Sequence, residues 1–147
     1  MQQAQSIGFE IKSVSNLIMR SIDAKIAEIP GHDCTKMHGW IIGYVYDKGK
    51  NHDVFQKDIE REFKIRRSTA TGMLQLMEKN GYMKRVSVEY DARLKKLVLT
   101  QKAIDLHKAI RTNIDEFEQG LMDCLTKEEQ DVFFQITGKL KRMLEQK

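Results

Sequence analysis

The chain has 147 residues and a formal net charge of +4, with 25 lysines and arginines against 21 aspartates and glutamates. Hydrophobic residues make up 41% and proline occurs once, which excludes collagen-like, low-complexity and globally disordered classes. No apolar run approaches the roughly 18 residues of a membrane span, and the first residues do not resemble a signal peptide. With two cysteines, we expect a single globular domain in the reducing cytoplasm, without a disulfide framework.

Two apolar stripes at helical spacing open the chain. The first covers residues 7–29 at steps of three, four and seven residues, and a Pro-Gly pair follows it. Thr35 is placed to cap a second helix, which carries Trp40 and Tyr44 one turn apart and ends near a glycine. We therefore expect two helices before residue 51.

Two shorter helices joined by a polar turn come next. The first covers residues 55–63 with apolar side chains on one face, and the second starts at Arg67 or Ser68 and ends at an Asn-Gly pair. A helix fits the major groove of B-DNA, and the side chains at its N-terminal end reach base edges. This end is basic and rich in hydroxyls, and Gly72 leaves room for close approach. The pattern predicts a helix-turn-helix.

The periodicity then changes from helical to alternating. Residues 82–90 and 97–99 alternate around a polar tip, Asp91-Ala92-Arg93, which predicts a β-hairpin with a longer loop. Arg93, flanked by Lys95 and Lys96, is placed to enter a neighbouring minor groove or to hold phosphates. All the excess positive charge lies between Gln56 and Lys96, a stretch that contains eleven basic and six acidic residues. A hairpin after a helix-turn-helix makes a winged helix-turn-helix.

The helical pattern returns at Thr100 and continues to the end of the chain. Thr126 and Glu129 have the spacing of a capping box that opens the last helix. The apolar stripes of the N- and C-terminal helices could form a helical bundle within one chain. A small winged unit offers these stripes little surface to pack on, however, so we expect them to be buried between two chains. The candidate dimer interface consists of Ile11, Ile18, Ile22, Phe117, Leu121, Phe133, Ile136 and Leu140.

Three of these segments resemble the MarR family of bacterial transcriptional regulators. Residues 68–85 resemble the family's recognition helix and its exit into the first wing strand. Asp91-Ala92-Arg93, followed by Leu97-Val98-Leu99-Thr100, is similar to the family's wing signature of an Asp-x-Arg tip and a Leu-Thr helix start. The number and order of the expected helices match the family over essentially the whole chain.

The resemblance implies a mainly α fold with a small β wing, in one domain over residues 1–147. A winged helix-turn-helix lobe at about 33–100 would be flanked by dimerisation helices at 7–29 and 100–146. It also implies a homodimer that binds a pseudo-palindromic operator in double-stranded DNA, usually as a repressor. In the family the wing arginine contacts the minor groove and the wing aspartate fixes the wing's conformation. The candidate DNA contacts are Gln56, Lys57, Arg66, Arg67, Ser68, Thr69, Thr71, Gln75, Arg85, Asp91, Arg93, Lys95 and Lys96.

Control of DNA binding is expected from a small molecule. Many members of the family release DNA on binding aromatic or amphipathic compounds. Core packing is the preferred interpretation of Trp40 and Tyr44, and the wall of such an effector site is the alternative. Other members respond to cysteine oxidation or zinc. Cys34 and Cys124 do not match the family's usual redox position, and the histidines and cysteine at 32, 34, 38 and 107 are too ordinary a grouping to predict a metal site. We predict no cofactor.

Catalysis and docking on a protein or on RNA are the alternatives to DNA binding. The chain contains no glycine-rich phosphate loop, no HExxH motif and no nucleophile elbow, so catalysis is not expected. A winged helix can also dock on a protein or on RNA, and a salt-sensitive preference for duplex DNA over single-stranded RNA would exclude that alternative.

Overall fold

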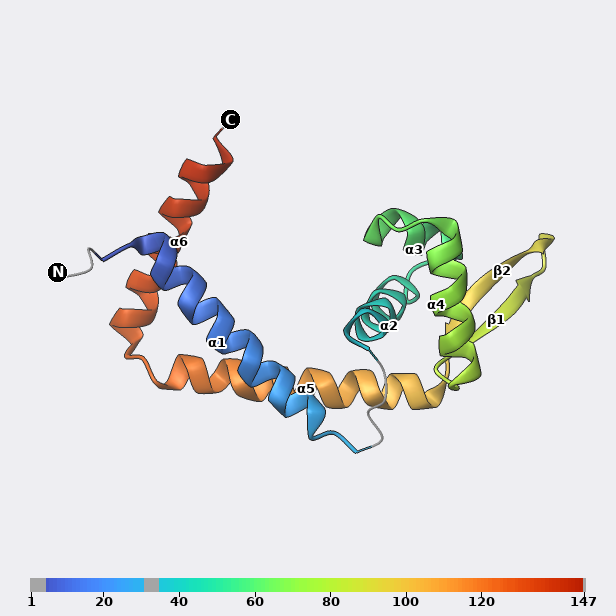
Figure 1. The fold of residues 1–147 in the computed structure, drawn as a ribbon, viewed down its shortest axis with the longest axis horizontal. Coiled ribbons are helices and arrows are strands. Elements are labelled where there is room, and N and C mark those ends of the chain that lie inside the picture. Colours follow the sequence, from blue (N-terminus) through green and yellow to red (C-terminus); the bar gives the residue numbers. More distant parts are fainter. Residues whose placement is uncertain (1–4, 31–34, 147) are drawn as a thin grey trace. The chain divides into compact units, whose positions relative to one another are not determined.

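A computed structural model describes residues 5–30 and 35–146 and divides the chain into two compact units. The central unit spans Ile26–Arg111, and the terminal unit combines Met1–Lys25 with Thr112–Lys147. The fold is mainly helical with one two-stranded sheet, as expected (Figure 1). No described helix is long and apolar enough to cross a membrane. In chain order the elements are α1 (Ile7–Ala27), α2 (Lys36–Lys48), α3 (Gln56–Phe63), α4 (Arg67–Lys79), β1 (Met83–Val88), β2 (Asp91–Leu99), α5 (Gln101–Asp123) and α6 (Lys127–Glu145).

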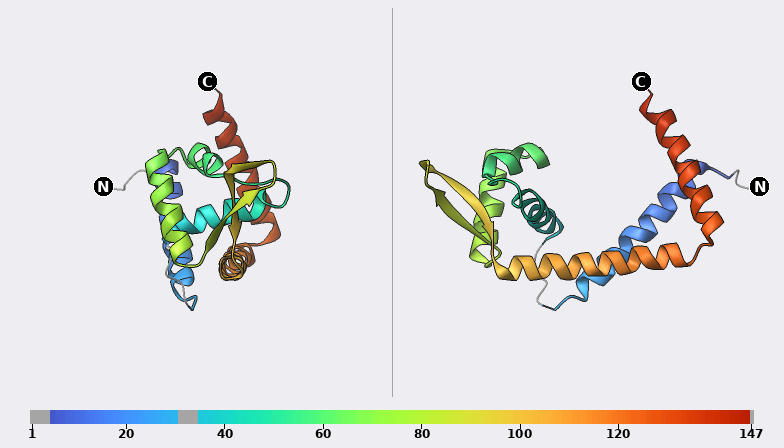
Figure 2. Two further views of the ribbon diagram at one scale, coloured as in Figure 1. Left: turned by 90° about the vertical axis from the view of Figure 1, so that its right-hand side faces the viewer. Right: turned by 180° about the vertical axis from the view of Figure 1, so that it is seen from behind.

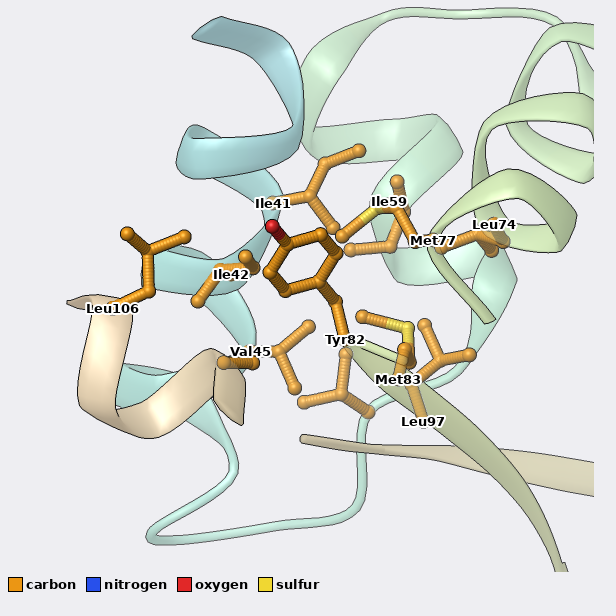
Figure 3. Packing of buried hydrophobic residues seen from close by; sticks show 12 residues of the cluster. Ile41, Ile42, Val45, Ile59, Leu74, Met77, Tyr82, Met83, Leu97 and Leu106 are labelled. Atoms are coloured by element: carbon orange, nitrogen blue, oxygen red, sulfur yellow. The ribbon is translucent and has the colours of Figure 1, made fainter. Parts of the chain in front are cut away.

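The core of the central unit surrounds Tyr82, which directly follows the turn after α4 and is 1% exposed. Figure 3 shows its ring among side chains from α2, α3, α4, both strands and the start of α5. Each fully buried aliphatic side chain stabilises the fold by about 1.5–3 kcal/mol. The apolar faces of four helices and the hairpin therefore meet at one point, and this contact holds the helix-turn-helix to the wing. The buried residues include Ile41, Ile42, Val45, Ile59, Leu74, Met77, Met83, Leu97 and Leu106.

The turn between α3 and α4 is short because it uses a left-handed residue. Phe55 precedes α3 as its N-cap, and its N–H donates to the Asp58 carboxylate at 2.8 Å. Lys64 ends the helix at φ 51°, and the following Ile65 N–H donates to the Glu60 carbonyl at 3.1 Å. Left-handed backbone is uncommon outside glycine, and here it redirects the chain within three residues into α4. The predicted helix-turn-helix is present.

The hairpin differs from the sequence expectation at its end. β1 and β2 are antiparallel, with Met83 opposite Leu99, and they project beyond α4 within the central unit (Figure 2). The turn consists of residues 89–90, whereas the sequence predicted a tip at Asp91-Ala92-Arg93. The pairing register shifts between Ser87 and Val88, so residues 92–94 have no partner on β1. Buried Val88 pairs with Asp91 and closes the hairpin early, which moves the predicted tip into a bulge on β2.

The terminal unit contains α1, the second half of α5, and α6. Thr126 Oγ1 accepts from the Glu129 N–H at 3.2 Å, and the Glu129 carboxylate accepts from the Thr126 N–H at 2.9 Å, which confirms the predicted capping box. The Asn113 amide donates to the Lys25 carbonyl at 3.3 Å and ties α5 to α1. α1 ends at Ala27, two residues before the predicted end, because Ile29 packs against the core of the central unit instead.

No residue of α1 or α6 is buried within the single chain. Soluble monomers rarely leave so many large apolar side chains in contact with water. The exposed large apolar residues of these helices are Ile7, Phe9, Ile11, Val14, Leu17, Met19, Val132, Phe133, Phe134, Ile136, Met143 and Leu144.

Two histidines of the central unit are placed where protonation is unfavourable. His38 on α2 is 4% exposed, and burial lowers its pKa below the ordinary 6.5. The His107 ring on α5 lies 4.4 Å from the Tyr46 ring. Burial is the main cause that lowers the pKa of His107, Arg111 and Lys50 add to it, and Asp47 opposes it. Both rings therefore take up a proton at a lower pH in the folded chain than a free histidine does.

The thermal midpoint of unfolding is expected to fall as the pH is lowered from about 7.5 to 5.5. The unfolded chain binds more protons than the folded chain below the unfolded histidine pKa of 6.5, so the free energy of unfolding decreases as pH drops through that value. Calorimetry of the wild type and of a His38→Gln/His107→Gln double variant measures this. A double variant whose midpoint falls as steeply as that of the wild type would contradict the assignment.

Candidate nucleic-acid interface

The N-terminal half of α4 presents one continuous polar face. Residues three, four and seven apart share a side of a helix, so Ser68, Thr71 and Gln75 line up on one face while Ala70 and Leu74 point into the core. These and their neighbours line a shallow hollow at the surface. It is formed by Arg66, Arg67, Ser68, Thr71, Gly72 and Gln75.

Six of the predicted DNA contacts therefore meet at the first half of α4 or directly beside it. Five of them, Arg66, Arg67, Ser68, Thr69 and Gln75, are exposed, and Thr71 is half-buried. A Cβ added to Gly72 would meet no atom within 4 Å, so the space above this glycine is open, as the sequence predicted. The face offers guanidinium, hydroxyl and amide groups, the types that bond to phosphates and base edges.

The half-buried side chain of Gln56 contacts α4. Its Nε2 donates to Thr71 Oγ1 at 2.9 Å and to the Arg67 carbonyl at 3.3 Å. The amide therefore joins the start of α3 to the first turn of α4. Lys57, the next residue, is exposed. The sequence predicted both residues as DNA contacts and did not predict the contact of Gln56 with Thr71.

The wing carries an exposed arginine on a constrained loop. Arg93 lies in the bulge of β2 and is exposed, and its backbone N–H donates to Asp91 Oδ1 at 2.9 Å. This bond fixes the chain direction at Arg93 through the side chain two residues earlier. Lys95 is exposed beside it, opposite Ser87. The bulge thus presents the positively charged Arg93 side chain near the turn of the hairpin.

Arg85 and Lys96, also predicted as DNA contacts, form ion pairs within the chain. Arg85 Nε lies 3.5 Å from a carboxylate oxygen of Glu78, and its Nε and Nη2 atoms are buried without a hydrogen-bond partner among the described residues. Lys96 Nζ lies 3.5 Å from Asp53 Oδ1. Both side chains therefore tie the wing to neighbouring segments, α4 and the loop before α3. Sequence reasoning missed Glu78, although it lies seven residues before Arg85 across a glycine turn.

The two candidate effector residues differ in exposure. Trp40 is 54% exposed, so the core-packing interpretation is wrong for it, and Lys36 Nζ lies 6.0 Å from its ring centroid. Tyr44 is half-buried and packs edge-to-face on Phe63, with ring centroids 5.9 Å apart. Burial raises the pKa of Tyr44, with smaller contributions from nearby carboxylates. Tyr44 thus packs against the edge of the core, whereas the Trp40 ring is exposed beside Lys36.

The residues of the redox and zinc alternatives are only partly described. Cys124 is a free, exposed thiol near the end of α5 and donates to the Leu121 carbonyl at 3.1 Å. Cys34 and His32 lie outside the described residues. Within the described part of the chain, no three His, Cys, Asp or Glu side chains are grouped to hold a metal ion.

Comparison with known proteins identifies the fold. The model of the MarR family matches residues 32–94. Staphylococcus aureus MepR in a DNA complex is 26% identical, with a TM-score of 0.75 over 93% of this chain and 96% of that one. MepR bound to ethidium bromide is also 26% identical, with a TM-score of 0.71 over 95% of each chain.

A structure from Clostridium acetobutylicum described as a MarR family transcriptional regulator is 29% identical, with a TM-score of 0.76 over 92% of this chain and 96% of that one. No curated protein sequence matches. The resemblance to the MarR family that the sequence predicted is therefore confirmed.

Proposed function

We propose that this chain, which the model of the MarR family matches over residues 32–94, is a MarR-type homodimeric repressor that binds a pseudo-palindromic site in double-stranded DNA. The observation that carries the proposal is the face of α4, where arginine, hydroxyl and amide side chains surround an open glycine. A solvated polar helix does not require that open glycine, whereas close approach to a groove does. The DNA complex of MepR, which matches 93% of this chain, supports the same role.

The apolar surface of the terminal unit supports two-fold assembly. The proposed interface residues on α1 and α6 are exposed or half-buried in the single chain, and Ile11, Phe133, Ile136 and Leu140 line one groove between these helices. A second copy would cover the same apolar faces through a two-fold axis. Two recognition helices about 34 Å apart would then read successive major grooves on one side of the duplex. A dimer bound at such a site would block transcription from a promoter that overlaps it.

Binding to a selected duplex should depend steeply on salt. If each protomer places α4 and the wing against phosphates, about eight contacts imply a slope near −7 for log affinity against log salt. We expect a dissociation constant on the order of 10⁻⁸ M or tighter at moderate salt. Site selection from randomised duplexes followed by titration at several salt concentrations measures both. A slope shallower than about −2 on the best site would contradict two-lobed docking, and equal affinity for single-stranded RNA would favour the RNA-docking alternative.

We further propose that an aromatic, cationic small molecule releases the DNA by contact with Trp40. The indole face is exposed and already lies near the Lys36 ammonium, and cations bind favourably over tryptophan rings. MepR with bound ethidium supports this ligand class. A ligand that prefers the non-binding conformation about 100-fold supplies about 2.7 kcal/mol against DNA binding.

Ethidium should quench the fluorescence of the protein in the absence of DNA, because Trp40 is its one tryptophan. The DNA-free format is needed because ethidium itself binds duplexes. Trp40→Phe should then lose ethidium-induced release in an operator-binding assay while keeping its operator affinity.

Parallel measurements of DNA release by peroxide and by a chelator test the redox and metal alternatives. Release by peroxide that disappears in a Cys34→Ser/Cys124→Ser variant would replace the ligand proposal by redox control.

A further inference from the structure

We infer that Gln56 is a positioning residue that fixes the Thr71 hydroxyl as a hydrogen-bond donor toward a base of the DNA site. The inference rests on the proposed function, since it concerns how the same face of α4 distinguishes bases. It predicts that the base pair opposite Thr71 is selected for a hydrogen-bond acceptor on its major-groove edge. It also predicts that the chemistry of residue 56 decides that preference, although residue 56 lies on another helix.

The orientation of the Gln56 amide follows from its two neighbours. Nitrogen and oxygen of a side-chain amide are assigned from hydrogen-bond partners, not from shape. Here the same terminal atom lies 2.9 Å from Thr71 Oγ1 and 3.3 Å from the Arg67 carbonyl oxygen. A carbonyl oxygen only accepts, so the atom that faces it must be the NH₂ nitrogen. One of its protons goes to Arg67, and the other goes to Thr71.

The direction of the Thr71 hydroxyl follows from that assignment. Its oxygen accepts from Gln56, and its own proton has no acceptor among the residues that the structure describes. Thr71 is half-buried and lines the hollow on α4 together with Gly72 and Gln75. The free proton must therefore turn toward the hollow or solvent. A hydroxyl that already accepts a hydrogen bond is also a stronger donor, because the two bonds polarise one another.

A hydroxyl held as a donor distinguishes bases that a freely rotating one does not. Threonine alone can donate or accept, so it usually tolerates any base edge. In the major groove, guanine offers only acceptors and thymine offers O4, whereas cytosine offers only the N4 amino donor. Adenine offers one of each. After accepting from Gln56, Oγ1 keeps one lone pair, so it could bond cytosine only through that lone pair with its proton turned away, whereas guanine and thymine accept the proton directly. Thr71 should therefore prefer guanine or thymine to cytosine at its position.

The test is a measurement of base preference in variants of residues 56 and 71. The wild-type protein should bind its selected site about 10-fold more tightly than the same site with cytosine at the Thr71 position. Thr71→Val keeps the shape and removes the hydroxyl, so this discrimination should disappear. Gln56→Ala frees the hydroxyl to rotate and should reduce the discrimination to about 2-fold or less.

Gln56→Glu is the most informative variant, because a carboxylate accepts but does not donate. The Thr71 proton should turn toward residue 56, and the hydroxyl oxygen would then face the DNA as an acceptor. The preference at this base pair should move toward cytosine, while affinity for every site falls through charge repulsion. Gln75→Ala is the matched control, since it should change the preference at a different base pair and leave this one intact.

The outcomes separate this inference from the proposed function. If the wild-type protein selects no duplex sequence, the proposed function fails. If it selects a site but both Gln56 variants weaken all sequences equally and keep the wild-type base preference, Gln56 is only a structural contact and the inference is wrong. Circular dichroism and thermal midpoints confirm that each variant is folded, and Thr71→Ser serves as a conservative replacement that should retain the discrimination.

Discussion

Phe133→Glu is expected to convert the protein from a dimer of about twice 17.1 kDa to a monomer at micromolar concentration. Phe133 is 53% exposed in the single chain and lies beside Ile136 on α6, so a monomeric fold would tolerate a carboxylate there. Within a two-fold apolar interface the same carboxylate would be buried without a partner. We expect the dissociation constant of the dimer to rise about 100-fold or more, which corresponds to about 2.8 kcal/mol.

The control for this experiment is Lys139→Glu, which also adds negative charge to an exposed position of α6. Light scattering and sedimentation should show that Lys139→Glu retains the mass of the wild type. The Phe133 variant should also lose specific DNA binding, since one recognition helix reads only half a site. If Phe133→Glu keeps the mass of the wild type, α6 does not form the interface.

Gly72→Phe is expected to abolish specific DNA binding while the protein stays folded. A Cβ at Gly72 would meet no atom within 4 Å in the free chain, so the aromatic side chain has room on the protein. That room is the space that the proposed docking assigns to a DNA groove, and a phenyl group would hold α4 away from it. Loss of the close contacts should weaken the best site about 100-fold or more, since about 2.8 kcal/mol corresponds to a factor of 100.

Gly72→Ala distinguishes steric blocking from altered helix stability. Alanine should stabilise α4 by about 0.8–1 kcal/mol relative to glycine, because glycine disfavours helix interiors. The thermal midpoint should therefore rise in the alanine variant, while DNA affinity falls less than in the phenylalanine variant. Unchanged DNA affinity in Gly72→Phe would show that this face of α4 does not enter the groove. A titration on the selected duplex and a melting curve for each variant provide both measurements.

The positions of most elements could be predicted from the sequence because they depend on local chemistry. Apolar spacing defines each helix, the Thr126–Glu129 pair starts α6, and the Asn80-Gly81 pair ends α4, where Gly81 adopts φ +78°. The face of α4 was equally predictable, since helical geometry alone turns Ser68 and Gln75 away from the buried Ala70 and Leu74 and places Thr71 at the edge between the two faces. These features need only neighbours within about one or two helical turns.

Only the tertiary structure determines which side chains from distant segments contact one another. The sequence predicts Arg85 and Lys96 as DNA contacts, but in the fold they form ion pairs with Glu78 and Asp53. The tip moved to residues 89–90 because Val88 is buried, and burial depends on the whole core.

The contact between Gln56 and Thr71 joins residues 15 positions apart in sequence. A polar side chain has many potential partners along the chain, and only the packing of α3 against α4 selects one. The residue types at the candidate interface were therefore determined by the sequence, and their hydrogen-bonding roles were determined by the fold.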